Sequence, residues 1–151
     1  MKNSDIVKIL KEIADLLELK GENIFKTRAY QKAARSIEYL SEDVDRLVEQ
    51  DRLREIPGVG DAIAKKITEL VTTGHLEYFD KLRAEFPEGI NLLLEIPGIG
   101  PHTALLITRE LKVTSVDELE KAIEEGRVAE LPRMGEKKAQ NILLQIKAMH
   151  K

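Results

Sequence analysis

The spacing of apolar residues along the chain is that of α-helices. Near the N-terminus, apolar residues recur three or four positions apart and form one stripe: Ile6, Ile9, Leu10, Ile13 and Leu17. This spacing matches the turn of an α-helix, and Gly21 stands where such a helix would end. No segment alternates apolar and polar residues with the β-branched enrichment that a half-buried strand needs. The pattern therefore predicts an all-α protein.

Capping residues mark the expected helix boundaries in the first half of the chain. A second helix is expected over Thr27–Leu40, and Ser41 is a residue type that commonly caps a helix start, here that of a third helix. Asp61 suits the start of a later helix that ends near Thr72, with Gly74 behind it as the terminating residue. The first half is thus expected to be a series of helices joined by short turns.

The second half carries similar signals. Pro101 suits the first turn of a helix, because the N–H that proline lacks would have no partner there. Ser115 and Glu118 have the spacing of a capping box, in which two side chains cap the start of a helix reciprocally. The last helix is expected to begin near Glu136 and to run to the end of the sequence.

A short pattern recurs three times between expected helices. The copies are Ile56-Pro57-Gly58-Val59-Gly60, Ile96-Pro97-Gly98-Ile99-Gly100 and Leu131-Pro132-Arg133-Met134-Gly135. Each joins a preceding helix to a following one through a tight turn. A regular period would indicate an α-solenoid, but the segments between the copies differ in length and content. We therefore expect two small helical lobes, residues 1–84 and 85–151, rather than a repeat array.

The glycines of the first two copies are suited to binding phosphate. Without a Cβ atom, Gly58 and Gly98 can adopt positive φ and let a phosphate approach the backbone. The helix that follows each turn begins with N–H groups that have no intrahelical partner and carry the positive end of the helix dipole. Such a module should bind DNA backbones with little sequence preference. In the third copy Arg133 replaces the first glycine, which favours a purely structural turn.

Charge and composition narrow the class of protein. The formal net charge of −3 is unusual for a DNA-binding domain, but its distribution is uneven. Four bases and no acid lie between residues 26 and 35: Lys26, Arg28, Lys32 and Arg35. Cysteine is absent, and no apolar run is long enough to cross a membrane. We expect a monomeric, cytoplasmic protein, associated with the nucleoid when bound to DNA, that needs no cofactor for binding.

These motifs, in this order, resemble the N-terminal part of family X DNA polymerases, the DNA polymerase beta-like enzymes, and most closely the bacterial and archaeal members. The resemblance rests on the stretch GENIFKTRAYQKAAR at residues 21–35, followed by two Ile-Pro-Gly-x-Gly hairpins, and it covers nearly the whole chain. It implies a DNA-end-binding lobe over residues 1–84 and a fingers-like lobe over 85–151. The palm, with its Gly-Ser motif and three metal-binding aspartates, has no counterpart here, so no polymerase activity is expected from these residues.

The resemblance implies a DNA-binding role for residues in both lobes. In the N-terminal lobe the family binds the 5′-phosphate of a gap in a basic pocket, to which Lys26 and Tyr30 correspond, with Lys32 and Arg35 extending the positive surface. Tyr30 could instead be a core residue with its hydroxyl at the surface. The hairpin residues expected at the DNA backbone are Gly58, Val59, Gly60 and Ala62 in the first copy and Gly98, Ile99, Gly100, His102 and Thr103 in the second.

Lys66 corresponds to the lysine that forms a Schiff base with an abasic sugar in lyase-active members. That chemistry needs a neutral amine and therefore a lowered pKa. On the expected helix Lys66 flanks the apolar stripe, whereas Lys65 points nearly opposite and lies four residues from both Asp61 and Glu69, as in an ordinary ion pair. Lys66 is therefore the candidate nucleophile. The competing interpretation is that Lys66 contacts phosphate only.

Several positions depart from the lyase-active members. Phe25 stands where they carry a histidine, and Ala62 and Tyr78 replace two basic pocket residues. The pocket is expected to be poorer in positive charge, which leaves phosphate binding as the expectation and lyase activity as a hypothesis. The resemblance also implies a Na⁺ or K⁺ ion at each hairpin, held by backbone carbonyls of Arg54, Ile56 and Val59 and of Leu94, Ile96 and Ile99.

Three functions remain open at this stage. The first is the binding of gapped or nicked DNA in base excision repair, with or without 5′-deoxyribose phosphate lyase activity. The second is a stand-alone helix-hairpin-helix scaffold that binds DNA without catalysis. The third is a protein-interaction module that uses the acidic stretch from Asp117 to Glu125.

Overall fold

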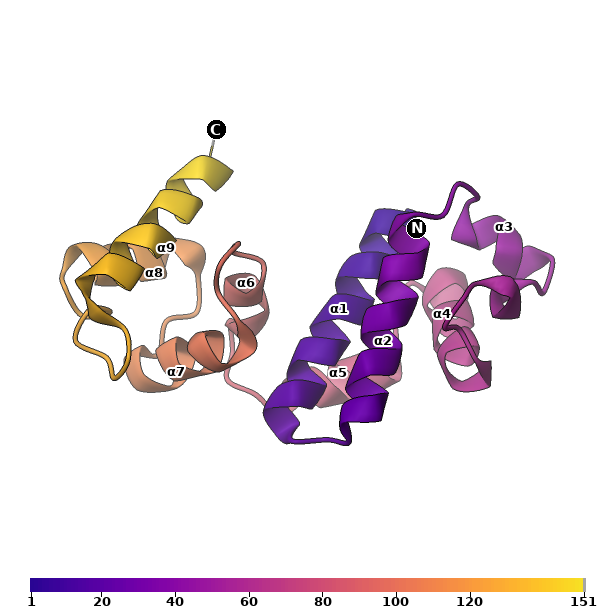
Figure 1. The fold of residues 1–151 in the computed structure, drawn as a ribbon, viewed down its shortest axis with the longest axis horizontal. Helices are drawn as coiled ribbons and strands as arrows, with labels where there is room; N and C mark the ends of the chain where they lie inside the picture. Colours follow the sequence, from indigo (N-terminus) through magenta and orange to yellow (C-terminus); the bar gives the residue numbers. More distant parts are fainter. Residues whose placement is uncertain (151) are drawn as a thin grey trace. The chain divides into compact units, whose positions relative to one another are not determined.

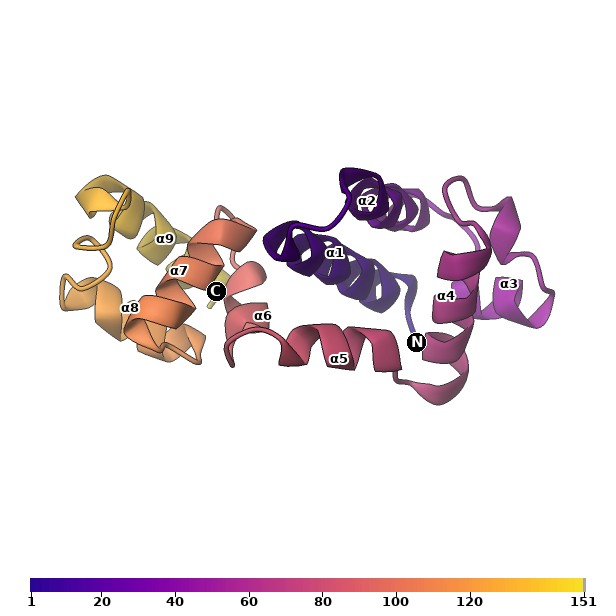
Figure 2. The same cartoon turned by 90° about the horizontal axis from the view of Figure 1, so that it is seen from below.

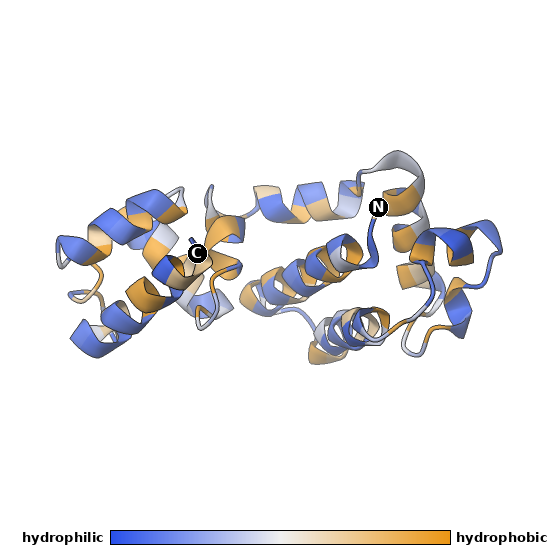
Figure 3. Cartoon of the chain, turned by 90° about the horizontal axis from the view of Figure 1, so that it is seen from above, coloured by the Kyte–Doolittle hydropathy of each residue, from blue (hydrophilic) through white to orange (hydrophobic). Residues whose placement is uncertain are grey.

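The structure, a computed structural model, describes residues 1–150, and every regular element in this range is a helix (Figure 1). The expected all-α class is thereby confirmed. The chain divides into two compact units, Met1–Arg83 and Ala84–Lys151. This division falls one residue before the lobe boundary expected from the sequence. Figure 3 shows apolar and polar residues alternating in bands along the helices, as expected for helices that bury only one side.

The first unit is built on a pair of long helices. α1 (Asn3–Lys20) and α2 (Ile24–Glu38) lie side by side in both Figure 1 and Figure 2. They are followed by α3 (Val44–Glu49), a 3₁₀ helix (Leu53–Glu55), α4 (Asp61–Thr73) and α5 (Glu77–Ala84). The α1 stripe predicted from the sequence lies in the core, apart from the half-buried Ile9. Gly21 and Gly74 terminate α1 and α4 with positive φ, as expected.

Two helix starts in this unit differ from the sequence prediction. α2 begins at Ile24 rather than Thr27, because the side chain of Asn23 caps it by accepting a hydrogen bond from the backbone N–H of Phe25 at 2.8 Å. α3 begins at Val44, so Ser41 is not its cap. The N–H of Val44 instead donates to the side chain of Asn3 at 2.9 Å, 41 residues away in sequence. This long-range cap has no local signal.

Up to residue 150, the second unit contains four helices after α5. They are α6 (Ile90–Leu94), α7 (Pro101–Leu111), α8 (Val116–Glu124) and α9 (Gly135–Met149). Pro101 begins α7, and α9 begins one residue before the expected start. The hydroxyl of Ser115 accepts from the N–H of Glu118 at 3.1 Å, which forms one half of the predicted capping box. In the other half, the Glu118 carboxylate is bound mainly by Thr114, through its backbone N–H at 2.6 Å and its hydroxyl at 2.9 Å.

Candidate nucleic-acid interface

The three hairpins share one turn conformation. The third residue of each copy has positive φ: 88° at Gly58, 89° at Gly98 and 65° at Arg133. The N–H of the next residue then donates to the carbonyl of the residue three positions earlier, at 3.0, 3.1 and 3.1 Å in the three copies. An arginine at this position carries the strain of the left-handed region, which glycine avoids. The third turn therefore adopts the same conformation although Arg133 stands in place of the glycine.

An apolar side chain anchors each turn. Val59, Ile99 and Met134 follow the positive-φ residue and are buried, as is the isoleucine that opens each of the first two copies. Because these anchors point into the core, the backbone on the outer side of the turn is left exposed: Pro57, Gly58, Pro97 and Gly98 all lie at the surface. The central apolar residue thus fixes each turn to the core.

The helix starts behind the turns separate the third copy from the other two. Gly60 and Gly100 have extended backbones and serve as N-caps of α4 and α7, and neither start has a side-chain cap. The first N–H groups of these helices thus have no capping side chain. An anion at either start would meet backbone N–H groups and the positive end of a helix dipole. In the third copy Gly135 has a φ of 76° and already belongs to α9, so that arrangement is not repeated.

A cluster of two lysines and two tyrosines lies on α2, α4 and α5. Tyr30 is only 3% exposed and stacks on Tyr78, with ring centroids 6.4 Å apart and planes 7° from parallel. The ammonium of Lys66 lies 4.7 Å from the Tyr78 ring centroid, and that of Lys26 lies 5.5 Å from it. Cations at these distances are attracted to the ring face. Tyr78 therefore brings together two lysines that are 40 positions apart in sequence.

The pKa values of Lys66 and Tyr30 are shifted in opposite directions within this cluster. Partial burial, and then the neighbouring charge of Lys26, lower the pKa of Lys66, while Glu69 opposes the shift. Burial raises the pKa of the Tyr30 hydroxyl, and Tyr78 acts in the same direction. Tyr30 is thus a core residue that also belongs to the cluster. The two interpretations of this position, core residue and pocket residue, are therefore compatible. Lys66 has the lowered pKa that a nucleophilic amine needs.

The two carboxylates expected to pair with Lys65 bind other groups. The carboxylate of Asp61 is hydrogen-bonded to the guanidinium of Arg54, which lowers the pKa of Asp61. The Glu69 carboxylate accepts a hydrogen bond from the backbone N–H of Glu77 at 2.8 Å. Both partners come from outside α4, so the spacing within the helix could not reveal them. Lys65 is exposed, as its position opposite the buried stripe predicted.

The remaining predicted residues lie on α2 or in the first turns of α4 and α7. The aliphatic stem of Lys32 lies against Gly58, and the Ser36 hydroxyl donates to the Pro57 carbonyl at 2.7 Å. Arg35 is exposed on α2, and Ala62 is exposed in the first turn of α4. His102 and Thr103 occupy the first turn of α7, exposed and half-buried respectively.

The described part of the chain contains neither a metal-ligand cluster nor a membrane-spanning helix. Within residues 1–150, no group of three or more His, Cys, Asp or Glu side chains could hold a metal ion. No helix of the same range has the length and apolar character needed to cross a membrane. The carbonyls of Ile56 and Ile96, which belong to the expected monovalent-cation sets, each accept the N–H that closes their turn.

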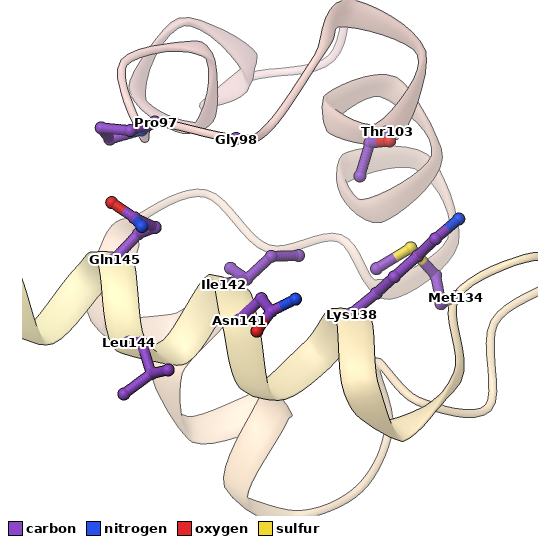
Figure 4. A pocket seen from close by; sticks show the side chains of 9 residues that line it. All are labelled: Pro97, Gly98, Thr103, Met134, Lys138, Asn141, Ile142, Leu144 and Gln145. Carbon is purple, nitrogen blue, oxygen red and sulfur yellow. The ribbon is translucent and has the colours of Figure 1, made fainter.

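Two features of the interface were missed by sequence reasoning. Tyr78 was interpreted only as the loss of a basic residue, because nothing in the local sequence shows that it lies between two lysines. A groove between the second hairpin and α9 was not predicted either. It has a volume of about 470 Å³, and Lys138, Asn141 and Gln145 line its α9 side (Figure 4). Their spacing on one helix face is the only signal that the sequence offers for it.

Comparison with known proteins identifies both units. Residues 1–76 match the helix-hairpin-helix domain family, and residues 90–148 match the SAM-like helix-hairpin-helix tandem family. The chain is 34% identical over 143 residues to the DNA polymerase/3′-5′ exonuclease PolX of Bacillus subtilis, an alignment that covers 95% of this chain and 25% of that protein. It is 32% identical over 109 residues to DNA polymerase lambda of Arabidopsis thaliana, covering 68% of this chain and 19% of that protein.

The chain is also similar to a subunit of a Holliday junction complex. The Holliday junction branch migration complex subunit RuvA of Methylibium petroleiphilum is 29% identical over 92 residues, covering 61% of this chain and 48% of that protein. The chain spans about a quarter and a fifth of the two polymerase relatives. On these matches and the geometry of its hairpins, the chain belongs to the helix-hairpin-helix family of DNA-binding domains and corresponds to the N-terminal region of family X DNA polymerases.

Proposed function

We propose that this chain binds gapped or nicked DNA through backbone phosphates, holds the 5′-phosphate end at the Lys26–Tyr78–Lys66 cluster, and removes 5′-deoxyribose phosphate in base excision repair. The observation that carries the proposal is the pair of ammonium groups gathered over the Tyr78 ring, one of them with a lowered pKa. The hairpins supply sequence-independent phosphate contacts, because their donors are backbone N–H groups that read no base edge.

The cluster suits an anionic end better than an uninterrupted backbone. Two ammonium groups near one ring face repel each other, and a phosphate with two negative charges between them would relieve that repulsion. Lys32, whose stem lies against Gly58, and Arg35 extend positive charge along the exposed side of α2. Tyr78 replaces a basic residue of the lyase-active relatives, but it holds the two remaining cations in place.

Lyase chemistry at this cluster would proceed through Lys66. The neutral amine attacks C1′ of the ring-opened deoxyribose, and loss of water gives a Schiff base. Removal of a proton from C2′ then breaks the C3′–O3′ bond, which releases the downstream strand with a 5′-phosphate. Water hydrolyses the remaining imine and regenerates the amine. Lys26 would hold the sugar's own 5′-phosphate during these steps.

A monovalent cation at each hairpin forms part of the proposal. The carbonyls of Ile56 and Ile96 use one lone pair for the turn hydrogen bond and keep a second one free. A Na⁺ or K⁺ ion bound by these and neighbouring carbonyls would bridge the turn to a DNA phosphate. Oxygen ligands of this kind suit hard cations.

Borohydride trapping on a nicked duplex with a 5′-deoxyribose phosphate tests the lyase assignment. We expect a covalent adduct with the unchanged chain, none with Lys66→Ala, and an undiminished adduct with Lys65→Ala. The last variant is the matched control, because Lys65 is the adjacent lysine on the opposite, exposed side of α4. Absence of any adduct at saturating protein would leave a DNA-binding scaffold without catalysis.

The lowered pKa of Lys66 gives this reaction a predictable pH dependence. Because burial and Lys26 disfavour the ammonium form, Lys66 should lose its proton below the ordinary lysine pKa of 10.5. The trapping rate should therefore rise with pH and level off below that value. Replacement of Lys26 by alanine removes one cause of the shift, so the profile should move to higher pH. An unmoved profile would contradict the coupling between the two lysines.

A further inference from the structure

The groove beside the second hairpin has the properties of a binding site. Pro97 and Gly98 form one side, and α9 forms the other with Asn141 and Gln145. Its volume of about 470 Å³ lies within the range of small-molecule sites. A Cβ atom at Gly98 would meet no other atom within 4 Å, so the turn backbone itself borders open space.

The two sides of the groove differ from its base in chemistry. Ile142 and Met134 contribute apolar, largely buried surface. Figure 4 shows Gln145 and Lys138 extending from α9 toward the hairpin and α7, with Ile142 between them. The described residues that line the groove include one cation, Lys138, and no carboxylate. A ligand with a flat apolar face, a polar edge and a negative charge nearby would match the apolar residues, the two amides and the cation of the groove.

The amide side chains are free to bind such a ligand. Neither Asn141 nor Gln145 makes a side-chain hydrogen bond within residues 1–150, whereas Gln140, on the opposite side of α9, donates to Glu136 at 3.1 Å. Lys138 donates to the carbonyl of Arg133 at 2.8 Å, which fixes this lysine at the end of the groove. Each amide offers both donors and acceptors, so the pair can bind the edge of any base.

We infer that this groove holds an unpaired nucleotide of a DNA strand whose neighbouring phosphate is bound at the second hairpin. The apolar floor of the groove would contact the face of the nucleobase, and the two amides would bind its edge. In a duplex the faces of the nucleobases are stacked on their neighbours and cannot make this contact. This inference rests on the proposed DNA binding and adds to it a preference for DNA with a single-stranded portion.

The test compares two labelled duplexes, both with 5′-phosphates, of which one carries a single-stranded tail of about six nucleotides. Affinity of the full chain is measured by fluorescence anisotropy. The double variant Asn141→Ala/Gln145→Ala should bind the tailed duplex roughly tenfold more weakly, as expected for the loss of two hydrogen bonds, and the blunt duplex unchanged. Gln140→Ala, the matched control on the same helix, should change neither affinity.

The salt dependence of binding identifies the kind of contact that is lost. Neutral amides displace no counterions, so the slope of log Kd against log salt should be the same in the double variant and the unchanged chain. An equal loss on both duplexes would overturn the inference, and so would no loss on either. If the unchanged chain bound neither duplex, the proposed function itself would fail, and the inference with it.

Discussion

The first and second hairpins have nearly the same backbone and different surroundings. At Gly58 a Cβ atom would lie 2.8 Å from Cγ of Lys32, so a lysine stem covers that turn, whereas the space beside Gly98 is open. The first helix residue is Asp61 in one copy, paired with Arg54, and Pro101 in the other. The same turn thus lies in two environments, one against a lysine stem and one beside a groove lined by two amides and Lys138. The neighbouring helices, not the turn, set these differences.

The largest effects are expected from replacing the turn glycines. Valine at φ near 88° is strongly strained, so Gly58→Val and Gly98→Val should each weaken binding to any DNA by roughly tenfold or more. Gly58→Val should also lower the melting temperature further than Gly98→Val, because its side chain displaces Lys32. Anisotropy titrations and thermal melts measure the two quantities.

Gly126 supplies the matched control for this comparison. It has a φ of 79° and open space around it, but it lies outside the hairpins. Gly126→Val should therefore cost stability through the same strain and leave DNA affinity unchanged. If it weakened DNA binding as much as Gly98→Val, the losses would reflect unfolding rather than a blocked turn.

An intermediate effect is expected from Lys26→Ala. Removing one exposed cation of the cluster should weaken binding to a gap with a 5′-phosphate about fivefold, and binding to the same gap with a 5′-hydroxyl hardly at all. Lys137→Ala removes an exposed charge from the other unit and should show no such discrimination. Equal weakening on both kinds of end by Lys26→Ala would contradict the assignment of a phosphate pocket to the first unit.

A smaller effect is expected from Tyr78. Because its ring attracts two ammonium groups, Tyr78→Leu should weaken binding to the 5′-phosphate end about threefold, as the loss of a cation–π contact would. Tyr78→Phe keeps the ring and should bind like the unchanged chain. If phenylalanine behaved like leucine in the same titration, the hydroxyl rather than the ring face would be responsible.

The smallest effect concerns the third hairpin and stability alone. Arg133 has a φ of 65°, so Arg133→Gly should relieve strain and raise the free energy of unfolding by about 0.5 kcal/mol, after the entropic cost of glycine. Lys112→Gly, at a φ of 54°, should give a similar gain. Thermal melts check both, and a lower melting temperature for Arg133→Gly would show that the arginine makes contacts that outweigh its strain.

Local signals in the sequence predicted the helices and the turns well. The α1 stripe, the glycines that end α1 and α4, and Pro101 at the start of α7 all depend on hydrogen bonds or burial within a few residues. Such features repeat with the helical period or occupy a fixed place in a turn, so they can be recognised one segment at a time. The three hairpins belong to this class, because each turn closes on itself.

The tertiary structure alone decided which distant side chains meet. Asn3 caps α3, Arg54 pairs with Asp61 in place of Lys65, and Tyr78 lies between Lys26 and Lys66. Each contact joins residues from different elements, and packing of the apolar faces sets their distance. The sequence by itself determined the class of fold and the conformation of the two Pro-Gly-x-Gly turns. The side chains that surround each turn could not be predicted from the sequence. They come from other helices, and only the packing of those helices brings them to the turn.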